Sequence, residues 1–279
     1  MKTKNLVLTI AVSIFMTSCV TSFYQVYKAV PTEKVVLKDN ALVYEDENCK
    51  VTYDFWGSGG NMSFQFYNKT DKNIYLNMEE SFFVVNGISY NYFKNREFSY
   101  ATSVGASAMK SVAASKSMTG VNYIDLLQTN SISATNAYGL ITSKGYSVTF
   151  NEEKILCIPS RTSKIITEYI INQTLIRDCE LFKYPAKKQI KTKNYSKNNS
   201  PLVFSNRLSY SVGQKENFIE FENEFYVSEI TNLPESEMIE EKQEEFCGQK
   251  AGLPLKFYKS ESPSKFFIQY LKGSDTWKH

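Results

Sequence analysis

Histidine is almost absent from this sequence, in which the terminal His279 is the only one among 279 residues. A Ser/His/Asp triad, a multi-histidine metal site and an internal imidazole base each need histidine inside the fold. The sequence therefore excludes these three kinds of site, whereas carboxylate and thiol chemistry remain open.

An excess of charge of one sign is also missing, since 32 Lys and Arg face 29 Asp and Glu, for a formal net charge of +3. Proteins that bind nucleic acid usually carry a clear basic excess. The motifs G-x-x-x-x-G-K-[ST], G-x-G-x-x-G and C-x-x-C, which mark phosphate, dinucleotide and zinc or redox sites, do not occur. We therefore expect no nucleic-acid partner, no metal and no cofactor.

Phenylalanine and tyrosine, by contrast, are abundant at 19 each, and 42% of the residues are apolar. This composition suffices to bury a sizeable core and is typical of globular proteins. The length fits one large domain or two small ones.

The first 19 residues have the pattern of an export signal. Lys2 and Lys4 precede an apolar run over 6–16, which is too short to span a bilayer, and small residues lead to Cys19. A cysteine in this position resembles the lipobox of bacterial lipoproteins, which implies cleavage by signal peptidase II and acylation of Cys19. The alternatives are an ordinary cleaved signal, with Cys19 incidental, and a buried N-terminal helix. On the lipoprotein interpretation, residues 1–18 are the signal peptide and residues 19–40 are an acylated tether.

The segment after Cys19 indicates which membrane face holds the protein. Lipoproteins of the Bacteroidota that reach the outer surface often resemble one another in an acidic cluster just after the cysteine, but here the first acid is Glu33. We therefore expect a lipid anchor in the outer membrane, on its periplasmic face.

The four remaining cysteines are Cys49, Cys157, Cys179 and Cys247. An even number in an oxidising compartment is consistent with two disulfides, although four cysteines allow three pairings and free buried thiols are the alternative. Cys157 and Cys179 enclose the shortest loop, so we expect a bridge between them.

Alternating apolar and polar residues predict an antiparallel meander over residues 41–93. The alternation runs over 51–55 and 62–66 on either side of a glycine-rich turn, and Asn86-Gly87 is typical of a two-residue hairpin turn. Such a sheet has one apolar face to cover, which implies a second sheet. Its candidate strands are 155–158, 165–171 as a central strand, 208–212, 218–221, 225–230 and 266–270.

Two stretches interrupt the strand pattern. Fourteen of the twenty residues at 101–120 are Ala, Ser, Gly or Thr, which predicts a long insertion over about 99–147, partly helical at 121–128. Pro234 to Phe246 has the pattern of a helix, with a proline in the first turn and Gly248 after the last. We therefore predict a mainly β, immunoglobulin-like antiparallel β-sandwich over residues 41–279, with this insertion and a short C-terminal helix.

The charges are distributed unevenly along the chain. Residues 181–215 hold eight bases and no acid, whereas residues 216–245 hold eleven glutamates and one lysine. One interpretation is a basic loop that meets anionic lipid headgroups through Lys187, Lys188, Lys191 and Lys193. The favoured alternative is a solvated loop whose charge is offset by the acidic segment folding beside it.

Two further patterns bear on function. The acid pairs Glu79-Glu80 and Glu152-Glu153 consist of adjacent residues, which point to opposite faces of a strand, so neither pair alone can act as the two carboxylates of a glycosidase. Aromatic side chains could form a binding face on the first sheet, although sheet faces and cores are commonly aromatic. These are Trp56, Tyr67, Tyr75, Tyr90 and Tyr92.

Several motifs together resemble a family of uncharacterised envelope lipoproteins of the Bacteroidota. They are the lipobox at Cys19, Tyr-Glu-Asp-Glu-Asn-Cys at 44–49, Asn-Lys-Thr-Asp at 68–71, and Cys-Ile-Pro-Ser at 157–160 followed by Ser-Lys-Ile-Ile at 163–166. The resemblance implies location but no activity. We expect a non-enzymatic binding or scaffolding module whose partner is an envelope protein or glycan. The alternatives are a carboxylate-dependent glycan or peptidoglycan enzyme and an adhesin or fimbria-like subunit.

Overall fold

The computed structural model describes residues 21–104, 114–116, 130–132, 144–250 and 252–273. The predicted signal peptide, Cys19, the expected helix at 121–128 and His279 lie outside the described residues. Within them the chain is mostly β, and the predicted antiparallel sandwich is confirmed.

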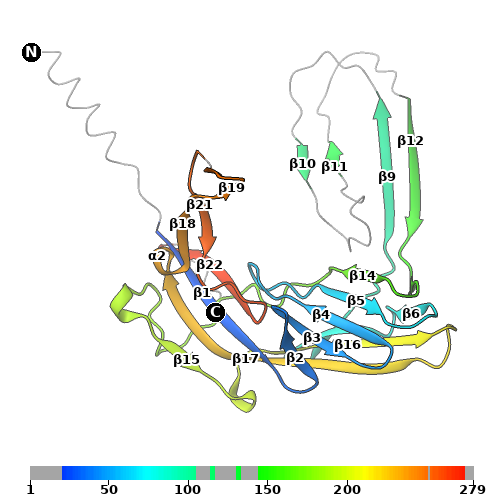
Figure 1. The fold of residues 1–279 in the computed structure, drawn as a ribbon, viewed down its shortest axis with the longest axis horizontal. Coiled ribbons are helices and arrows are strands. Elements are labelled where there is room, and N and C mark those ends of the chain that lie inside the picture. The colour runs from blue at the N-terminus through cyan, green and yellow to red at the C-terminus, as the bar shows by residue number, and fades with distance from the viewer. Residues whose placement is uncertain (1–20, 105–113, 117–129, 133–143, 251, 274–279) are drawn as a thin grey trace, which may run out of the picture.

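Two antiparallel sheets form the body of the protein (Figure 1). The larger has nine strands and the smaller has five, against the roughly seven to nine in all of an immunoglobulin domain. The larger sheet contains β1 (Ser22–Pro31), β6 (Ile74–Asn77), β7 (Phe82–Val85), β8 (Ile88–Asn91), β13 (Ile155–Ile158), β15 (Thr192–Asn194), β16 (Val203–Val212), β17 (Ile219–Pro234) and β22 (Lys265–Leu271). The smaller sheet contains β2 (Val35–Lys38), β3 (Ala41–Glu45), β4 (Cys49–Tyr53), β5 (Phe64–Asn68) and β14 (Ser163–Ile166).

The core between the sheets is built from aromatic rings. Tyr53 contacts Phe225 with ring centroids 5.5 Å apart, Phe55 contacts Phe204 at 5.4 Å, and Phe66 contacts Tyr210 at 5.7 Å. Each contact joins the chain of the smaller sheet to β16 or β17. The alternation of buried and solvent-facing residues along β4 and β5 is thus explained by one face packing on the larger sheet.

The predicted hairpins form, but the predicted division of strands between the sheets is partly wrong. β7 and β8 are joined by Asn86-Gly87, both with positive φ, as the sequence indicates. However, β6, β7 and β8 belong to the larger sheet, because the turn after β5 carries the chain across the core. The buried Asn68 fixes this turn by donating to the carbonyls of Lys72 and Ile158.

Residues 165–171 were expected to form a central strand, and this prediction is wrong. The strand is β14, and it lies at the edge of the smaller sheet, where it pairs only with β5. Its Ile165 side chain is exposed.

The prediction of a tether over residues 19–40 is also wrong for residues 21–40, which the structure describes. Ser22–Pro31 is strand β1, which lies between β17 and β22 inside the larger sheet. Six of its ten residues are buried, including Tyr27, which stacks on Phe266 at 4.6 Å. Residues 22–38 therefore contribute strands to the sandwich domain, which does not begin at residue 41.

Two extensions leave the body. The predicted insertion begins and ends as a hairpin of β9 (Glu97–Val104) and β12 (Lys144–Asn151), and β10 (Ala114–Lys116) pairs with β11 (Asn130–Ile132) within it. The second extension follows β17 and consists of helix α2 (Glu235–Met238) and a hairpin. The hairpin pairs β18 (Ile239–Lys242) with β21 (Leu255–Tyr258), and β19 (Glu245–Phe246) with β20 (Gln249–Lys250).

The predicted helix over residues 234–246 is therefore too long. A short helix exists, but it ends at Met238, whose fully buried side chain packs against β1 and β22. The chain then pairs as strands because Cys247 and Gly248 have positive φ and form a tight two-residue turn. Two short 3-10 helices, η1 (Lys187–Gln189) and η2 (Lys197–Asn199), complete the described elements.

Candidate functional site

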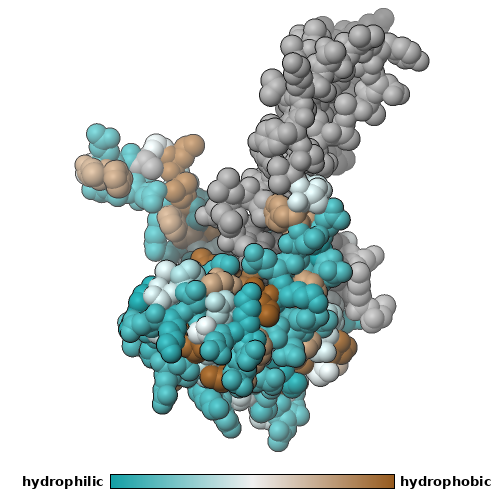
Figure 2. Space-filling model, turned by 90° about the vertical axis from the view of Figure 1, so that its right-hand side faces the viewer, coloured by the Kyte–Doolittle hydropathy of each residue, from teal (hydrophilic) through white to brown (hydrophobic). Residues whose placement is uncertain are grey.

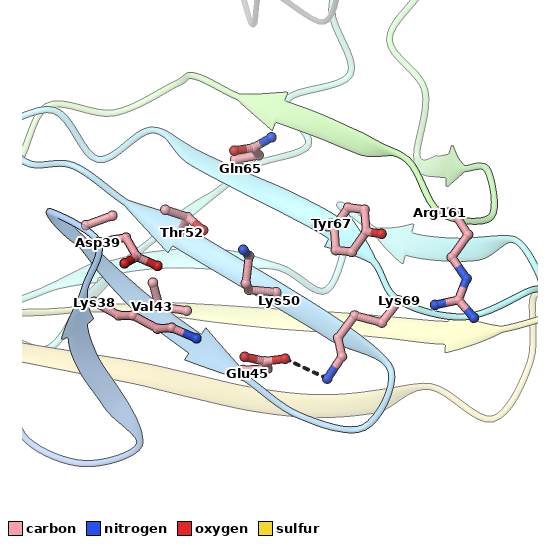
Figure 3. Close-up of a pocket in the computed structure, with 11 residues that line it drawn as sticks. Lys38, Asp39, Val43, Glu45, Lys50, Thr52, Gln65, Tyr67, Lys69 and Arg161 are labelled. Atoms are coloured by element: carbon pink, nitrogen blue, oxygen red, sulfur yellow. Dashed lines mark ion pairs between the residues drawn. The ribbon is translucent and has the colours of Figure 1, made fainter.

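A hollow of about 480 Å³ lies on the solvent face of the smaller sheet (Figure 3). Neighbouring strands place its side chains in rows across the sheet. Glu45 on β3 is opposite Lys50 on β4, which is opposite Tyr67 on β5. Such a row spans about 10 Å, since neighbouring strands are about 4.8 Å apart. The hollow is lined by Lys38, Asp39, Ala41, Val43, Glu45, Lys50, Thr52, Gln65, Tyr67, Lys69 and Arg161.

Four bases and two acids line the hollow, and one of the bases, Arg161, is paired with Asp71 at 2.9 Å. Glu45 accepts an ion pair from Lys69 at 2.8 Å. The hydrogen bond and charge of Lys69 lower the pKa of the Glu45 carboxyl below its usual value, and the charges of Lys38 and Lys50 lower it further. Glu45 therefore stays ionised and neutralises only part of the positive charge.

The chemistry of this hollow suits a polar, negatively charged ligand. Lys38 and Lys50 offer ammonium groups, and Thr52 and Gln65 offer neutral hydrogen-bonding groups on the same face. The half-exposed ring of Tyr67 provides a flat surface on which a sugar ring can stack.

The predicted aromatic face does not form as a unit. Of the five aromatic residues proposed for it, only Tyr67 lines the hollow. Trp56 packs on Tyr258 at 5.2 Å, Tyr92 is buried, and Tyr75 lies on β6 of the other sheet. In the sequence, the hollow is indicated by the polar residues that alternate with apolar residues along β4 and β5. A prediction from the aromatic residues does not find it.

The basic loop lies beside the acidic segment, as the solvated-loop interpretation predicts. β15 pairs with β17, and three bases of the loop form ion pairs with glutamates of the acidic segment. These pairs are Lys187–Glu237 at 2.9 Å, Lys197–Glu224 at 2.6 Å and Arg207–Glu222 at 3.0 Å.

The four predicted lysines differ in their surroundings. Lys187 pairs with Glu237, Lys193 pairs with Glu180, and Lys191 lies over the Phe182 ring at 5.7 Å, whereas Lys188 is exposed on η1. Their contact with an anionic surface remains a prediction.

Two carboxylates do converge, at the root of the β9–β12 hairpin, but both bind one arginine. The guanidinium of Arg96 donates to Glu152, and its Nη1 donates to Glu168 at 2.8 Å. Glu152 also accepts from the backbone N–H of Lys94 at 2.8 Å and of Arg96 at 3.1 Å. Burial alone would raise the pKa of Glu152, but the hydrogen bonds from Arg96 and Lys94 lower it below its usual value. This geometry fastens the hairpin to the body.

A second hollow, of about 660 Å³, contains the glutamates Glu80, Glu220 and Glu222 together with Arg207. Glu222 is paired with Arg207, and Glu80 accepts a hydrogen bond from Asn77 at 3.1 Å. Among the residues that the structure describes, no group of His, Cys, Asp and Glu is arranged to hold a metal ion.

The predicted disulfide between Cys157 and Cys179 is not present, and all four cysteines that the structure describes are free. Cys157 on β13 is opposite Tyr75 of β6, which is opposite Ser211 of β16. The neighbouring residue of β16, Tyr210, is opposite Ile219 at the beginning of β17. Cys179 is adjacent to Glu180, which pairs with Lys193 opposite Ile230 of the same strand. Ile230 comes eleven positions after Ile219, which corresponds to roughly 36 Å of strand, so a bridge is geometrically impossible.

The adhesin alternative requires an open groove or a donated strand in the sandwich. In the larger sheet the position between β17 and β22 is filled by the protein's own β1, which pairs with β17 from Phe23 to Pro31 and with β22 from Ser22 to Lys28.

No helix among the described residues is long and apolar enough to cross a membrane. Comparison of the chain with protein-family models, with curated proteins and with solved structures finds no match.

Proposed function

We propose that this protein is a lipid-anchored, non-enzymatic binding module of the bacterial envelope, held on the periplasmic face of the outer membrane by acyl chains on Cys19. Its ligand is an acidic glycan, which binds in the hollow of the smaller sheet. The observation that carries the ligand proposal is the row Glu45–Lys50–Tyr67, with further bases around it, on a solvent-facing sheet surface.

The geometry favours binding over carboxylate catalysis. A glycosidase needs two carboxyl groups free to face one substrate bond. The two buried carboxylates that converge, Glu152 and Glu168, are instead occupied by Arg96. In the hollow, Glu45 is paired with Lys69 and is surrounded by bases that favour an anionic ligand.

The ligand proposal predicts charge-dependent binding. Acidic oligogalacturonate is expected to bind the protein more tightly than neutral maltohexaose, and added salt should weaken its binding. Lys50→Glu reverses the charge at the centre of the row, so affinity should fall about tenfold, the equivalent of about 1.4 kcal/mol. Isothermal titration calorimetry measures both effects.

The matched control is Lys188→Glu, which makes the same charge change on an exposed lysine of the basic loop. It should leave binding unchanged. Equal binding of the acidic and neutral sugars, or an equal loss in both variants, contradicts the ligand proposal.

The anchor is tested separately in cells. Globomycin, which inhibits signal peptidase II, should cause the unprocessed precursor to accumulate. Mass spectrometry of the untreated protein should find an N-terminal peptide that begins at an acylated Cys19. A processed chain in the presence of globomycin would show that the lipid anchor does not exist.

A further inference from the structure

The described chain begins at one end of the larger sheet. The backbone N–H of Lys272 donates to the carbonyl of Thr21 at 3.0 Å, Ser22 is opposite Leu271, and Phe23 is opposite Pro234. Ser22 comes three positions after Cys19, and a fully extended chain covers at most about 3.5 Å per position. Cys19 therefore lies within about 10 Å of this end of the sheet.

The β18–β21 hairpin leaves the body from the same end. Its base is α2, which follows Pro234 directly, and the buried Met238 packs with Tyr24 of β1 and Phe267 of β22. Trp56 and Tyr258 complete this cluster, with ring centroids 5.2 Å apart. This apolar cluster holds the start of the hairpin next to the beginning of β1.

The outer part of this hairpin exposes large apolar side chains on a projecting structure. Phe246 is 80% exposed and Leu253 is 78% exposed, and Leu255 and Phe257 are also exposed. Figures 1 and 2 show the hairpin projecting away from the body, and in Figure 2 much of its surface is hydrophobic. A soluble surface seldom presents such a group of side chains without a partner.

The hairpin is long enough to reach a membrane that holds Cys19. Phe246 comes eight positions after Met238, which corresponds to roughly 26 Å of extended strand. This exceeds the reach of the segment that joins Cys19 to the sheet. A leaflet that holds acyl chains at Cys19 is therefore within reach of the hairpin tip.

The charges of the hairpin favour the apolar part of a leaflet over an anionic surface. Residues 239–258 contain four glutamates and three lysines. Glu245 is adjacent to Phe246 on β19, and adjacent strand residues point to opposite faces, so its carboxylate can stay among the headgroups while the ring enters the lipid.

We propose that the β18–β21 hairpin is a second membrane anchor, which inserts Phe246 and Leu253 into the leaflet that holds the acyl chains of Cys19. This proposal rests on the lipid anchor of the proposed function. The acyl chains and the hairpin together hold the body in one orientation at the membrane. A single acylated residue would leave the body free to rotate.

A fluorophore can be attached at the tip of the hairpin, because the free Cys247 is exposed between Phe246 and Gly248. The experiment uses the acylated protein in phosphatidylcholine vesicles, with Cys157→Ser and Cys179→Ser and the environment-sensitive fluorophore NBD on Cys247. Vesicles should shift its emission to the blue, and spin-labelled lipid should quench it. Phe246→Ser with Leu253→Ser should abolish both responses.

The control places the same fluorophore at the other end of β17, in the exposed turn before this strand, through Glu216→Cys with Cys247→Ser. That probe should respond to neither vesicles nor quencher. In a non-acylated Cys19→Ser chain, the double serine substitution should lower partitioning into vesicles at least tenfold.

Two results would overturn the inference. One is a Cys247 probe that stays in water although mass spectrometry shows acylated Cys19, which leaves the lipid anchor of the proposed function intact. The other is a blue shift without vesicles that grows with protein concentration, which would assign the apolar tip to contact with a second copy. Absence of the acyl group in the mass spectrum refutes the proposed anchor itself.

Discussion

A chain that begins at Thr32 is expected not to fold, whereas a chain that begins at Thr21 folds. The shorter chain lacks β1, which lies inside the larger sheet and hydrogen-bonds to β17 on one side and to β22 on the other. It also loses Tyr27 from the core. Loss of both ladders and this buried surface exceeds the net stability of about 5–15 kcal/mol that a domain has. Thermal unfolding followed by circular dichroism compares the two chains.

A graded variant separates the role of β1 from a general effect of truncation. Tyr27→Ala removes a fully buried ring that stacks on Phe266, and large aromatic side chains cost about 3–5 kcal/mol when truncated in a core. Lys38→Ala, at an exposed position on β2, should change the free energy of unfolding by less than about 0.5 kcal/mol. If the chain from Thr32 unfolds at the same temperature as the chain from Thr21, residues 22–31 are a tether after all.

Arg96→Ala is expected to lower the free energy of unfolding by about 3 kcal/mol at pH 7. The substitution leaves the carboxylate of Glu152, whose side chain is 0% exposed, without its cation, whereas Glu168, which is 5% exposed, keeps the ion pair with Lys94 at 2.6 Å. Breaking a buried ion pair on one side costs about 3–5 kcal/mol, and the partial exposure of Arg96 favours the lower value. Urea denaturation measures the difference.

The pH dependence of this effect has a definite sign. Because the pKa of Glu152 is lower in the folded protein than in the unfolded chain, its contribution to stability is present above the unfolded pKa and is lost as the pH falls through the folded pKa. In Arg96→Ala the buried carboxyl loses this stabilisation and gains from protonation. The difference between the variant and the wild type should therefore shrink as the pH falls below about 4.5.

Arg161→Ala is the matched control for Arg96→Ala. Arg161 pairs with Asp71 at 2.9 Å, but both side chains are mostly exposed. Exposed pairs contribute about 0–1 kcal/mol, so this variant should unfold almost as the wild type does at every pH. An equal loss of stability in both variants would contradict the assignment of Arg96 as the residue that fastens the β9–β12 hairpin.

Local patterns predicted much of the fold because strands and turns leave local signatures. The alternation in β4 and β5 and the Asn86-Gly87 turn predicted two hairpins that the structure contains. The helix prediction failed after Met238 because the spacing of apolar residues cannot distinguish a helix from a hairpin closed by Cys247-Gly248. Strand β1 is not predicted from the sequence, because a segment just after a predicted export signal is interpreted as a tether.

The candidate site was less predictable than the fold. Lys50 and Tyr67 are seventeen positions apart in the sequence, and only the register of β4 and β5 places them opposite each other. Likewise, Arg96, Glu152 and Glu168 become neighbours only because the long insertion starts and ends at the same point of the body.

The sequence by itself determined that the chain is mainly β, that its single histidine is His279, and that basic and aromatic side chains are abundant. These properties follow from the composition and from the two-residue period of strands, both of which can be read from the sequence without knowing which distant residues meet. Only the tertiary structure decided which sheet each strand joins, that Cys157 and Cys179 lie far apart, and that the basic loop is paired with the acidic segment. Those outcomes depend on strand order and register, which are set by the packing of distant residues in one core.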